Sequence, residues 1–169
     1  MTSAAARWAV ALESWRLPDH LLEAATQTTF LSPPTLWRRA RLAEARHGAG
    51  ETRKLVLSLL GDLGSLLDVG AGTGRISAPV AALGHSVTAV EPDEAMAEGL
   101  AAEAMELGVE IARIAGTWPE SASATGRHDV VLCANVVYNV ADIEPFLKGL
   151  HRAATRAVVI ELTPAHPWT

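Results

Sequence analysis

The sequence predicts an α/β domain with a mainly parallel sheet of about five strands and helices on both faces. From Ser65 onward, short apolar runs alternate with longer amphipathic stretches, which is the pattern of strands joined by crossover helices. Runs such as "AVVI" are apolar without alternation, as expected for strands that are buried on both sides. A glycine-rich turn follows the first apolar run and predicts a strand leading into a helix. The expected strands are residues 66–69, 86–91, 109–114, 129–134 and 157–162.

Helices are expected between these strands and throughout the first sixty residues. Pro18 interrupts the first helical pattern, Ser32 followed by two prolines is typical of a helix start, and Gly48 is typical of a helix end. The expected helices are residues 6–15, 21–25, 32–48, 51–60, 73–83, 93–107 and 142–153. A chain of 169 residues has the size of one domain. We therefore expect a single domain, with a helical lid at 1–60, a core at 61–162 and a tail at 163–169.

Composition and charge narrow the possible partners. Of the 169 residues, 49% are hydrophobic and 20% are charged, and the formal net charge is −5. This is an ordinary globular composition, and its acidic balance gives no basic field that would attract nucleic acid or anionic lipid. No uninterrupted apolar stretch reaches the length of about 18 residues that marks a membrane span. We expect no nucleic-acid partner, no membrane partner and a cytoplasmic location.

Cysteine and histidine usage gives no sign of a disulfide or a metal site. Cys133 is the only cysteine, so no intramolecular disulfide can form, and the surrounding run "VVLCANVV" favours a buried strand residue. The six histidines are scattered without the spacing of metal ligands, so no bound metal is expected.

The stretch "LLDVGAGTGR", residues 66–75, predicts a ligand site at the carboxyl edge of the sheet. A strand that enters a glycine-rich turn and then a helix lets a ligand approach the backbone closely and favours a negative group near the helix amides. Dinucleotides and S-adenosylmethionine are the two large ligand classes that use this geometry. A dinucleotide fingerprint reads G-x-G-x-x-G, whereas the glycines here, Gly70, Gly72 and Gly74, are spaced G-x-G-x-G.

An acid in this stretch separates the two ligand classes further. Asp68 lies two residues before Gly70, close to where a dinucleotide would place its pyrophosphate. Two like charges roughly 4 to 6 Å apart repel by a few kcal/mol at an effective dielectric constant of about 20. The methionine part of S-adenosylmethionine instead offers an ammonium group that can pair with this acid. Asp68 therefore favours S-adenosylmethionine.

Together these motifs resemble those of the class I S-adenosylmethionine-dependent methyltransferases. Their first motif is similar to "LLDVGAGTGR", and "VTAVEPDEAM" places Glu91 where the family has an acid that binds the ribose hydroxyls. The segment "AGTWPE" resembles the family's adenine-edge loop, and "VVLCANVVYNV" resembles the fourth-strand motif beneath the reactive methyl group. The resemblance implies a three-layer Rossmann-like fold with strand order 3-2-1-4-5 and methyl transfer to a small molecule by in-line displacement, with S-adenosylhomocysteine as product. The cofactor-binding residues implied are Asp68, Gly70, Ala71, Gly72, Gly74, Glu91, Pro92, Thr117, Trp118 and Asn135.

Several residues keep a second interpretation. Trp118 is either an adenine contact or a core side chain beneath its loop, and Glu91 alone would also suit a helix start. Because the methyl donor is already activated, no acid or base is strictly required, and the candidate proton acceptors are only Tyr138, Asn135 and His166. Two other functions stay open: a cofactor-binding module without turnover, and an NAD(P)-dependent oxidoreductase.

The resemblance covers about residues 50–162 and does not include the last third of the usual fold. We therefore expect a fragment of a longer protein or an unusually short domain. The run "AVVIEL" would then be an apolar strand at the edge of the sheet, and such an edge favours pairing with another chain. This predicts self-association through the fifth strand.

Overall fold

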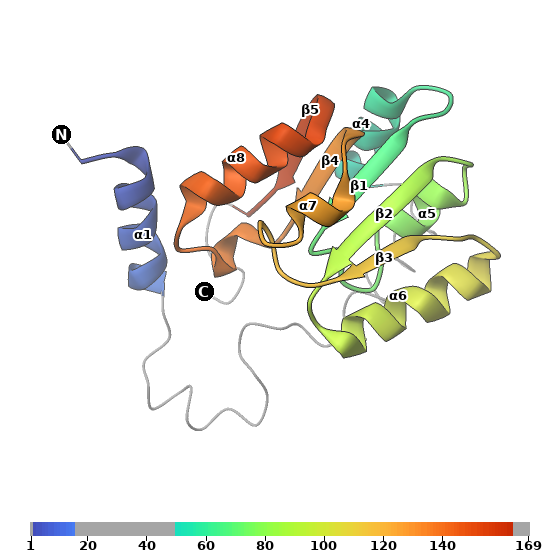
Figure 1. Ribbon diagram of the computed structural model, residues 1–169, viewed down its shortest axis with the longest axis horizontal. Helices are drawn as coiled ribbons and strands as arrows, with labels where there is room; N and C mark the ends of the chain where they lie inside the picture. Colours follow the sequence, from blue (N-terminus) through green and yellow to red (C-terminus); the bar gives the residue numbers. More distant parts are fainter. Residues whose placement is uncertain (1, 16–49, 164–169) are drawn as a thin grey trace.

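One parallel sheet with helices on both faces forms the centre of the molecule (Figure 1). The computed structural model describes residues 2–15 and 50–163. The sheet has five strands in the order β3-β2-β1-β4-β5, and every neighbouring pair is parallel, which confirms the predicted class and strand order. The strands are β1 (Ser65–Val69), β2 (Ser86–Glu91), β3 (Ala112–Ala115), β4 (His128–Ala134) and β5 (Ala154–Glu161).

Helices cover both faces of the sheet, and the N-terminal helix lies outside these two layers (Figure 1). The helices are α1 (Ala4–Trp15), α4 (Glu51–Leu60), α5 (Ser77–Ala81), α6 (Glu94–Leu107), α7 (Ala122–Thr125), α8 (Ile143–Ala153) and the 3-10 turn η1 (Val137–Asn139). Successive residues of a strand point to opposite faces, so Leu66 packs with α4 and α5 while Leu67 packs with α8. On the first of these faces, Leu100 of α6 packs against Ala89 of β2.

The central strands are buried from both sides, as their continuous apolar runs predict. Leu66, Leu67 and the β4 residues Val130 to Cys133 have relative exposures of 0%. Cys133 is therefore a buried strand cysteine, and burial raises the pKa of its thiol to about 12. A thiol in this state is not a nucleophile at neutral pH.

The helix after the glycine loop is shorter than predicted. It begins at Ser77, whereas the sequence pattern predicts a start near residue 73. Gly72 and Gly74 have φ values of 56° and 80°, so the chain is still turning through the region that would have been the first helical turn. A short helix, α7, also lies in the segment that the composition predicts to be loop.

Two predicted strand boundaries are also wrong. β3 begins at Ala112 because Gly108 ends α6 in the left-handed conformation, and the amide of Val109 then donates back to the carbonyl of Ala104. β5 begins at Ala154 and follows α8 without an intervening loop, so the predicted strand from residue 157 misses its first three residues.

The N-terminal helix α1 confirms the predicted helix at 6–15, but its apolar face is only partly buried. None of its residues is buried, and Val10 is 69% exposed. It packs beside α8 (Figure 1). The predicted helices at 21–25 and 32–48 lie outside the described residues. Of the helices that the structure describes, none is long and apolar enough to cross a membrane.

Candidate active site

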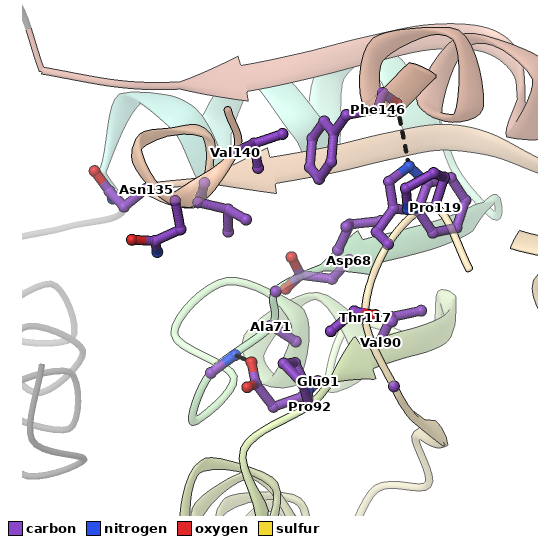
Figure 2. Close-up of a pocket in the computed structure, with 18 of the residues that line it drawn as sticks. Asp68, Ala71, Val90, Glu91, Pro92, Thr117, Pro119, Asn135, Val140 and Phe146 are labelled. Atoms are coloured by element: carbon purple, nitrogen blue, oxygen red, sulfur yellow. Dashed lines mark hydrogen bonds between the residues drawn. The ribbon is translucent and has the colours of Figure 1, made fainter. Parts of the chain in front are cut away.

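A cavity of about 780 Å³ opens at the carboxyl ends of β1, β2 and β4. The chain leaves β1 between β2 on one side and β4 on the other, and this change in strand order is where open α/β sheets form their ligand sites. The volume lies in the usual range for a small-molecule site. Figure 2 shows Ala71, Glu91 and Pro92 on one side of the cavity, and Asn135, Val140 and Phe146 on the other. We call these the glycine-loop side and the β4–α8 side.

The conformation of the glycine loop is fixed by backbone hydrogen bonds and by close packing against neighbouring side chains. A side chain at Gly70 would overlap with Val136. The amides of Gly70 and Ala71 donate to the carbonyl of Val90, and that of Gly74 donates to the carbonyl of Ala71. These amides are therefore already hydrogen-bonded within the protein, and the main contribution of the loop is that a ligand can come close to its backbone. Gly72 alone among these glycines faces open space, with its nearest neighbour at 4.0 Å.

Glu91 links the end of β2 to this loop. Its side chain is buried, and one carboxylate oxygen accepts from the amide of Gly72 at 2.8 Å while the other accepts from the amide of Asp93 at 2.9 Å. Burial raises the pKa of Glu91, and the two backbone hydrogen bonds oppose this effect. Each carboxylate oxygen still has lone-pair capacity for a ligand hydroxyl. The acid is thus both a support for the loop and a possible acceptor.

Asp68 lies between the two sides of the cavity, with its carboxyl group pointing into it (Figure 2). It is 3% exposed, and burial raises its pKa to about 7. The nearby Ser77 hydroxyl and the positive charge of Arg75 lower this pKa, and the negative charges of Glu91 and Glu161 raise it. The Ser77 hydroxyl makes no hydrogen bond of normal geometry to another described residue, so its proximity offsets only part of the effect of burial on Asp68. Burial outweighs the support from Ser77 and Arg75, so a cationic ligand would stabilise the ionised carboxyl group.

A cluster at the ends of β4 and β5 was not predicted from the sequence. Arg75 donates to the Glu161 carboxylate at 2.7 Å, and the Asn135 side-chain amide donates to the same oxygen at 2.8 Å. The backbone amide of Asn135 also donates to the carbonyl of Glu161 at 2.9 Å, and Asn135 has a φ of 59°, which asparagine tolerates well. Burial pushes the pKa of Glu161 upward, but the bonds from Arg75, Thr52 and Asn135 and the Arg75 charge together lower it.

Trp118 is a core side chain, as one of its two interpretations predicts, and it also borders the cavity. It lines the cavity, yet it is only 8% exposed and belongs to the core beneath α8. Its ring nitrogen donates to the carbonyl of Phe146 at 3.2 Å, and Gly149 leaves the space that the ring fills. The neighbouring Thr117 hydroxyl donates to the Glu120 carboxylate at 2.8 Å.

The candidate proton acceptors are held by other residues or lie outside the described part. Tyr138 is buried, and its hydroxyl is hydrogen-bonded to the Thr163 hydroxyl at 2.8 Å and to the Thr163 amide. His166 lies outside the described residues. Within residues 2–15 and 50–163, no group of three or more His, Cys, Asp or Glu side chains is arranged to hold a metal ion. Asn135 and Tyr138 both line the cavity.

Comparison with known families identifies the core. The model of a methyltransferase domain family matches residues 66–156, which is more than half of the 169-residue chain. The chain belongs to this methyltransferase domain family. The matched range runs from the first residues of β1 into β5 and includes the glycine loop, Glu91 and Asn135.

Curated relatives of this methyltransferase domain include the ubiquinone biosynthesis O-methyltransferases. The chain is 43% identical to that of Caulobacter sp. strain K31 over 84 residues, which are 49% of this chain and 33% of the relative. It is 38% identical to that of Rickettsia canadensis over 85 residues, which are 50% of this chain and 36% of the relative. The chain thus spans about a third of the length of these relatives.

Solved structures support the same fold. A TehB-like SAM-dependent methyltransferase from Corynebacterium glutamicum superposes with a TM-score of 0.64 at 20% identity, covering 80% of this chain and 76% of that one. The magnesium protoporphyrin IX methyltransferase of Synechocystis, solved with bound S-adenosylhomocysteine, superposes with a TM-score of 0.52 at 18% identity, covering 75% and 54%. At these identities the likeness concerns the fold alone.

Proposed function

We propose that this chain binds S-adenosylmethionine and transfers its methyl group to a small-molecule acceptor. One observation carries the proposal: the charge of the cavity. Its lining groups that carry charge when ionised near neutral pH are the carboxyls of Asp68, Glu91, Glu120 and Asp142 and the guanidinium of Arg75. Since Arg75 is paired with Glu161, the lining favours a cationic ligand. At about 5 Å and an effective dielectric constant of about 20, each charge pair is worth about 3 kcal/mol.

This charge separates the two cofactor classes. S-adenosylmethionine has an ammonium group, a sulfonium group and one carboxylate, so its net charge is positive. A dinucleotide instead brings a pyrophosphate, which the acidic lining repels. The family and the similarity to O-methyltransferases support the same choice and support oxygen as the accepting atom.

The amino-acid end of the cofactor is assigned to the loop after β1. In the proposal the Asp68 carboxylate pairs with the ammonium group, which relieves the penalty of burying that acid. Gly70, Ala71 and Gly72 line the cavity and supply a backbone that can be approached closely. Gly74, which the sequence also assigns to the cofactor, is not among the lining residues; its lack of a side chain leaves room for Leu100 of α6. The open space at Gly72 supports this role most directly.

The nucleoside end is assigned to the loops after β2 and β3. Glu91 accepts hydrogen bonds from the ribose hydroxyls, for which its two buried oxygens keep free lone pairs. Pro92, Thr117 and Trp118 border the adenine, and Asn135 closes the cavity from the end of β4. All of them line the same cavity.

Catalysis in this proposal rests on alignment. When bound, the cofactor supplies a methyl group that its positive sulfur has already activated. The chain contributes positioning and exclusion of water, which can lower a barrier by roughly 7 to 11 kcal/mol in favourable cases. Asn135 and Tyr138, which are held by Glu161 and Thr163, suit the fixed shape of the acceptor side.

Calorimetric titration tests the proposal. S-adenosylmethionine and S-adenosylhomocysteine should bind saturably to the full chain, and NAD should not. Asp68→Ala and Glu91→Ala should weaken binding by at least about tenfold, since each removes a charge-assisted contact. Glu98→Gln, on the exposed part of α6, is the matched control and should bind as the wild type does.

The remaining outcomes separate the alternatives. Release of S-adenosylhomocysteine with a panel of phenols and catechols as acceptors would support turnover. Binding without any release would support a cofactor-binding module. Tighter binding of NAD than of S-adenosylhomocysteine would overturn the proposal in favour of an oxidoreductase.

Self-association through β5 is a separate part of the proposal. Among the described strands β5 pairs only with β4, and Ala157, Val158 and Ile160 are partly exposed. A second copy could pair with this edge. Light scattering at high concentration should show a dimer, and a monomer would contradict it. We further propose a cytoplasmic protein without a nucleic-acid partner, in which residues 1–60, 61–162 and 163–169 are the lid, core and tail of one domain.

A further inference from the structure

A hydrogen bond joins the N-terminal helix to the cavity wall. The ring nitrogen of Trp8 in α1 donates to the carbonyl of Val140 at 2.8 Å, across 132 residues of sequence. Trp8 is partly buried and packs against the core cluster that contains Phe146 and Trp118. Its ring also meets that of Trp15 edge to face, with centroids 6.1 Å apart. No residue of α1 is fully buried, and Trp8 is the residue of α1 that packs against this cluster.

Val140 lies in the connection between β4 and α8, which lines the cavity opposite the glycine loop (Figure 2). Its amide donates to the carbonyl of Val137, and the amide of Asn139 donates to the carbonyl of Val136. The hydrogen bonds of η1 therefore fix the amide groups of this segment. Trp8 holds the segment through the carbonyl of Val140. Beyond Val140, Ala141 and Asp142 are exposed and also line the cavity.

We infer that Trp8 is a positioning residue that fixes the acceptor side of the cavity through the Val140 carbonyl. The inference rests on the proposed function in one respect: apart from Asn135, the groups assigned to the cofactor are Asp68 and residues of the loops after β1, β2 and β3, which leaves the wall at 139–142 for the acceptor. Trp8 itself does not line the cavity, and acts through the backbone of Val140.

Two variants separate this role from simple packing. Trp8→Phe keeps an aromatic ring but removes the donor, whereas Trp8→Ala removes both. Trp15→Phe is the matched control, because it removes an indole N–H from the same helix and keeps an aromatic ring beside Trp8. If Trp8 only fills space, Trp8→Phe will behave as the wild type and only Trp8→Ala will differ.

Hydrogen exchange on the full chain, followed by mass spectrometry, gives the decisive readout. In Trp8→Phe the amides of Asn139 and Val140 should exchange about threefold to tenfold faster, as expected for the loss of one hydrogen bond. The amides of β1 and β2 should be unchanged, and Trp15→Phe should match the wild type throughout. Equal exchange at 139–140 in Trp8→Phe and the wild type would overturn the inference.

Titration of the same variants with S-adenosylhomocysteine tests the assignment to the acceptor side. Affinity in Trp8→Phe should stay within about twofold of the wild type, because Asp68 and Glu91 are untouched. A loss as large as that of Asp68→Ala would show that this wall belongs to the cofactor and would overturn the assignment. Absence of binding in the wild type would refute the proposed function, while the exchange experiment would still decide whether Trp8 fixes the wall.

Discussion

The hydrogen bonds that fix the two sides of the cavity differ in how far apart their partners lie in the sequence. On the glycine-loop side, the fixing bonds are short in sequence: Gly72 to Glu91 and Asp93 to Glu91 span 19 and 2 residues. On the β4–α8 side they are long: Trp8 to Val140 spans 132 residues and Arg75 to Glu161 spans 86. The first side is therefore encoded in one contiguous stretch, and the second depends on segments that meet only after the sheet has formed.

The largest expected effect concerns the one acid that lies between these two sides. Burial raises the pKa of Asp68 from 3.8 to about 7, so between these pH values the folded state holds a proton that the unfolded state has released. Stability therefore falls as the pH rises through this window. Asp68→Asn removes this dependence and should stabilise the ligand-free chain at pH 8 by up to about 4 kcal/mol.

Urea unfolding at pH 4 and pH 8 measures this effect. At pH 4 the variant should differ little from the wild type, because the carboxyl is then protonated in the folded state. The exposed Glu98→Gln should have no effect at either pH. Equal stability of Asp68→Asn and the wild type at pH 8 would show that this acid is not strained by burial.

The next largest effect tests the contact where the two sides meet. A Cβ at Gly70 would overlap with the Val136 side chain, and the φ of 72° is unfavourable for alanine. Gly70→Ala should destabilise the fold by about 3 kcal/mol. Gly72→Ala, with a φ of 56° but open space, should cost only about 1 kcal/mol.

The double variant Gly70→Ala/Val136→Ala sharpens this comparison. Removing the Val136 branches should recover the part of the loss that comes from overlap and leave the part that comes from backbone strain. Equal losses of unfolding free energy for Gly70→Ala and Gly72→Ala would show that Gly70 and Val136 are not in tight steric contact.

A smaller effect is expected on the β4–α8 side. Glu161→Gln weakens the bonds to Arg75 and Asn135 and should cost about 1 to 2 kcal/mol at pH 7. Because the folded-state pKa of Glu161 is lowered, the wild-type advantage is present above its ordinary value of 4.5 and is lost as the pH falls through the folded-state pKa. Thermal unfolding of both proteins from pH 3 to pH 7 would reveal this, and a constant difference would contradict it.

The contrast between the two sides also explains what could be predicted from sequence. The alternation of strands and helices follows from periodicity, and the glycine loop and Glu91 follow from short motifs of neighbouring residues. The strand order was implied only by the resemblance to the family. Arg75 stands inside the quoted motif, but its partner Glu161 is identified only by the register of β4 with β5. The contact of Trp8 with Val140 leaves no local pattern at all.

The boundary errors have similarly physical causes. A helix from residue 73 was predicted because the residues are compatible with one, yet Gly72 and Gly74 keep the backbone turning. Val109 and Ile111 have strand-like side chains, but Val109 is used to close the end of α6 and Ile111 packs against the helix layers. Tertiary contacts decided these positions, and local propensity could not reveal them.

The affinity for S-adenosylhomocysteine as a function of pH tests the central claim most directly, namely that a buried carboxyl group receives the cationic end of the cofactor. Titrations from pH 5.5 to pH 8.5 should show affinity rising through pH 7 as Asp68 ionises, with a loss of about tenfold one pH unit below the pKa. Asp68→Asn should bind weakly, and its affinity should not change across this range. A wild-type affinity that stays constant or falls with rising pH would contradict the account.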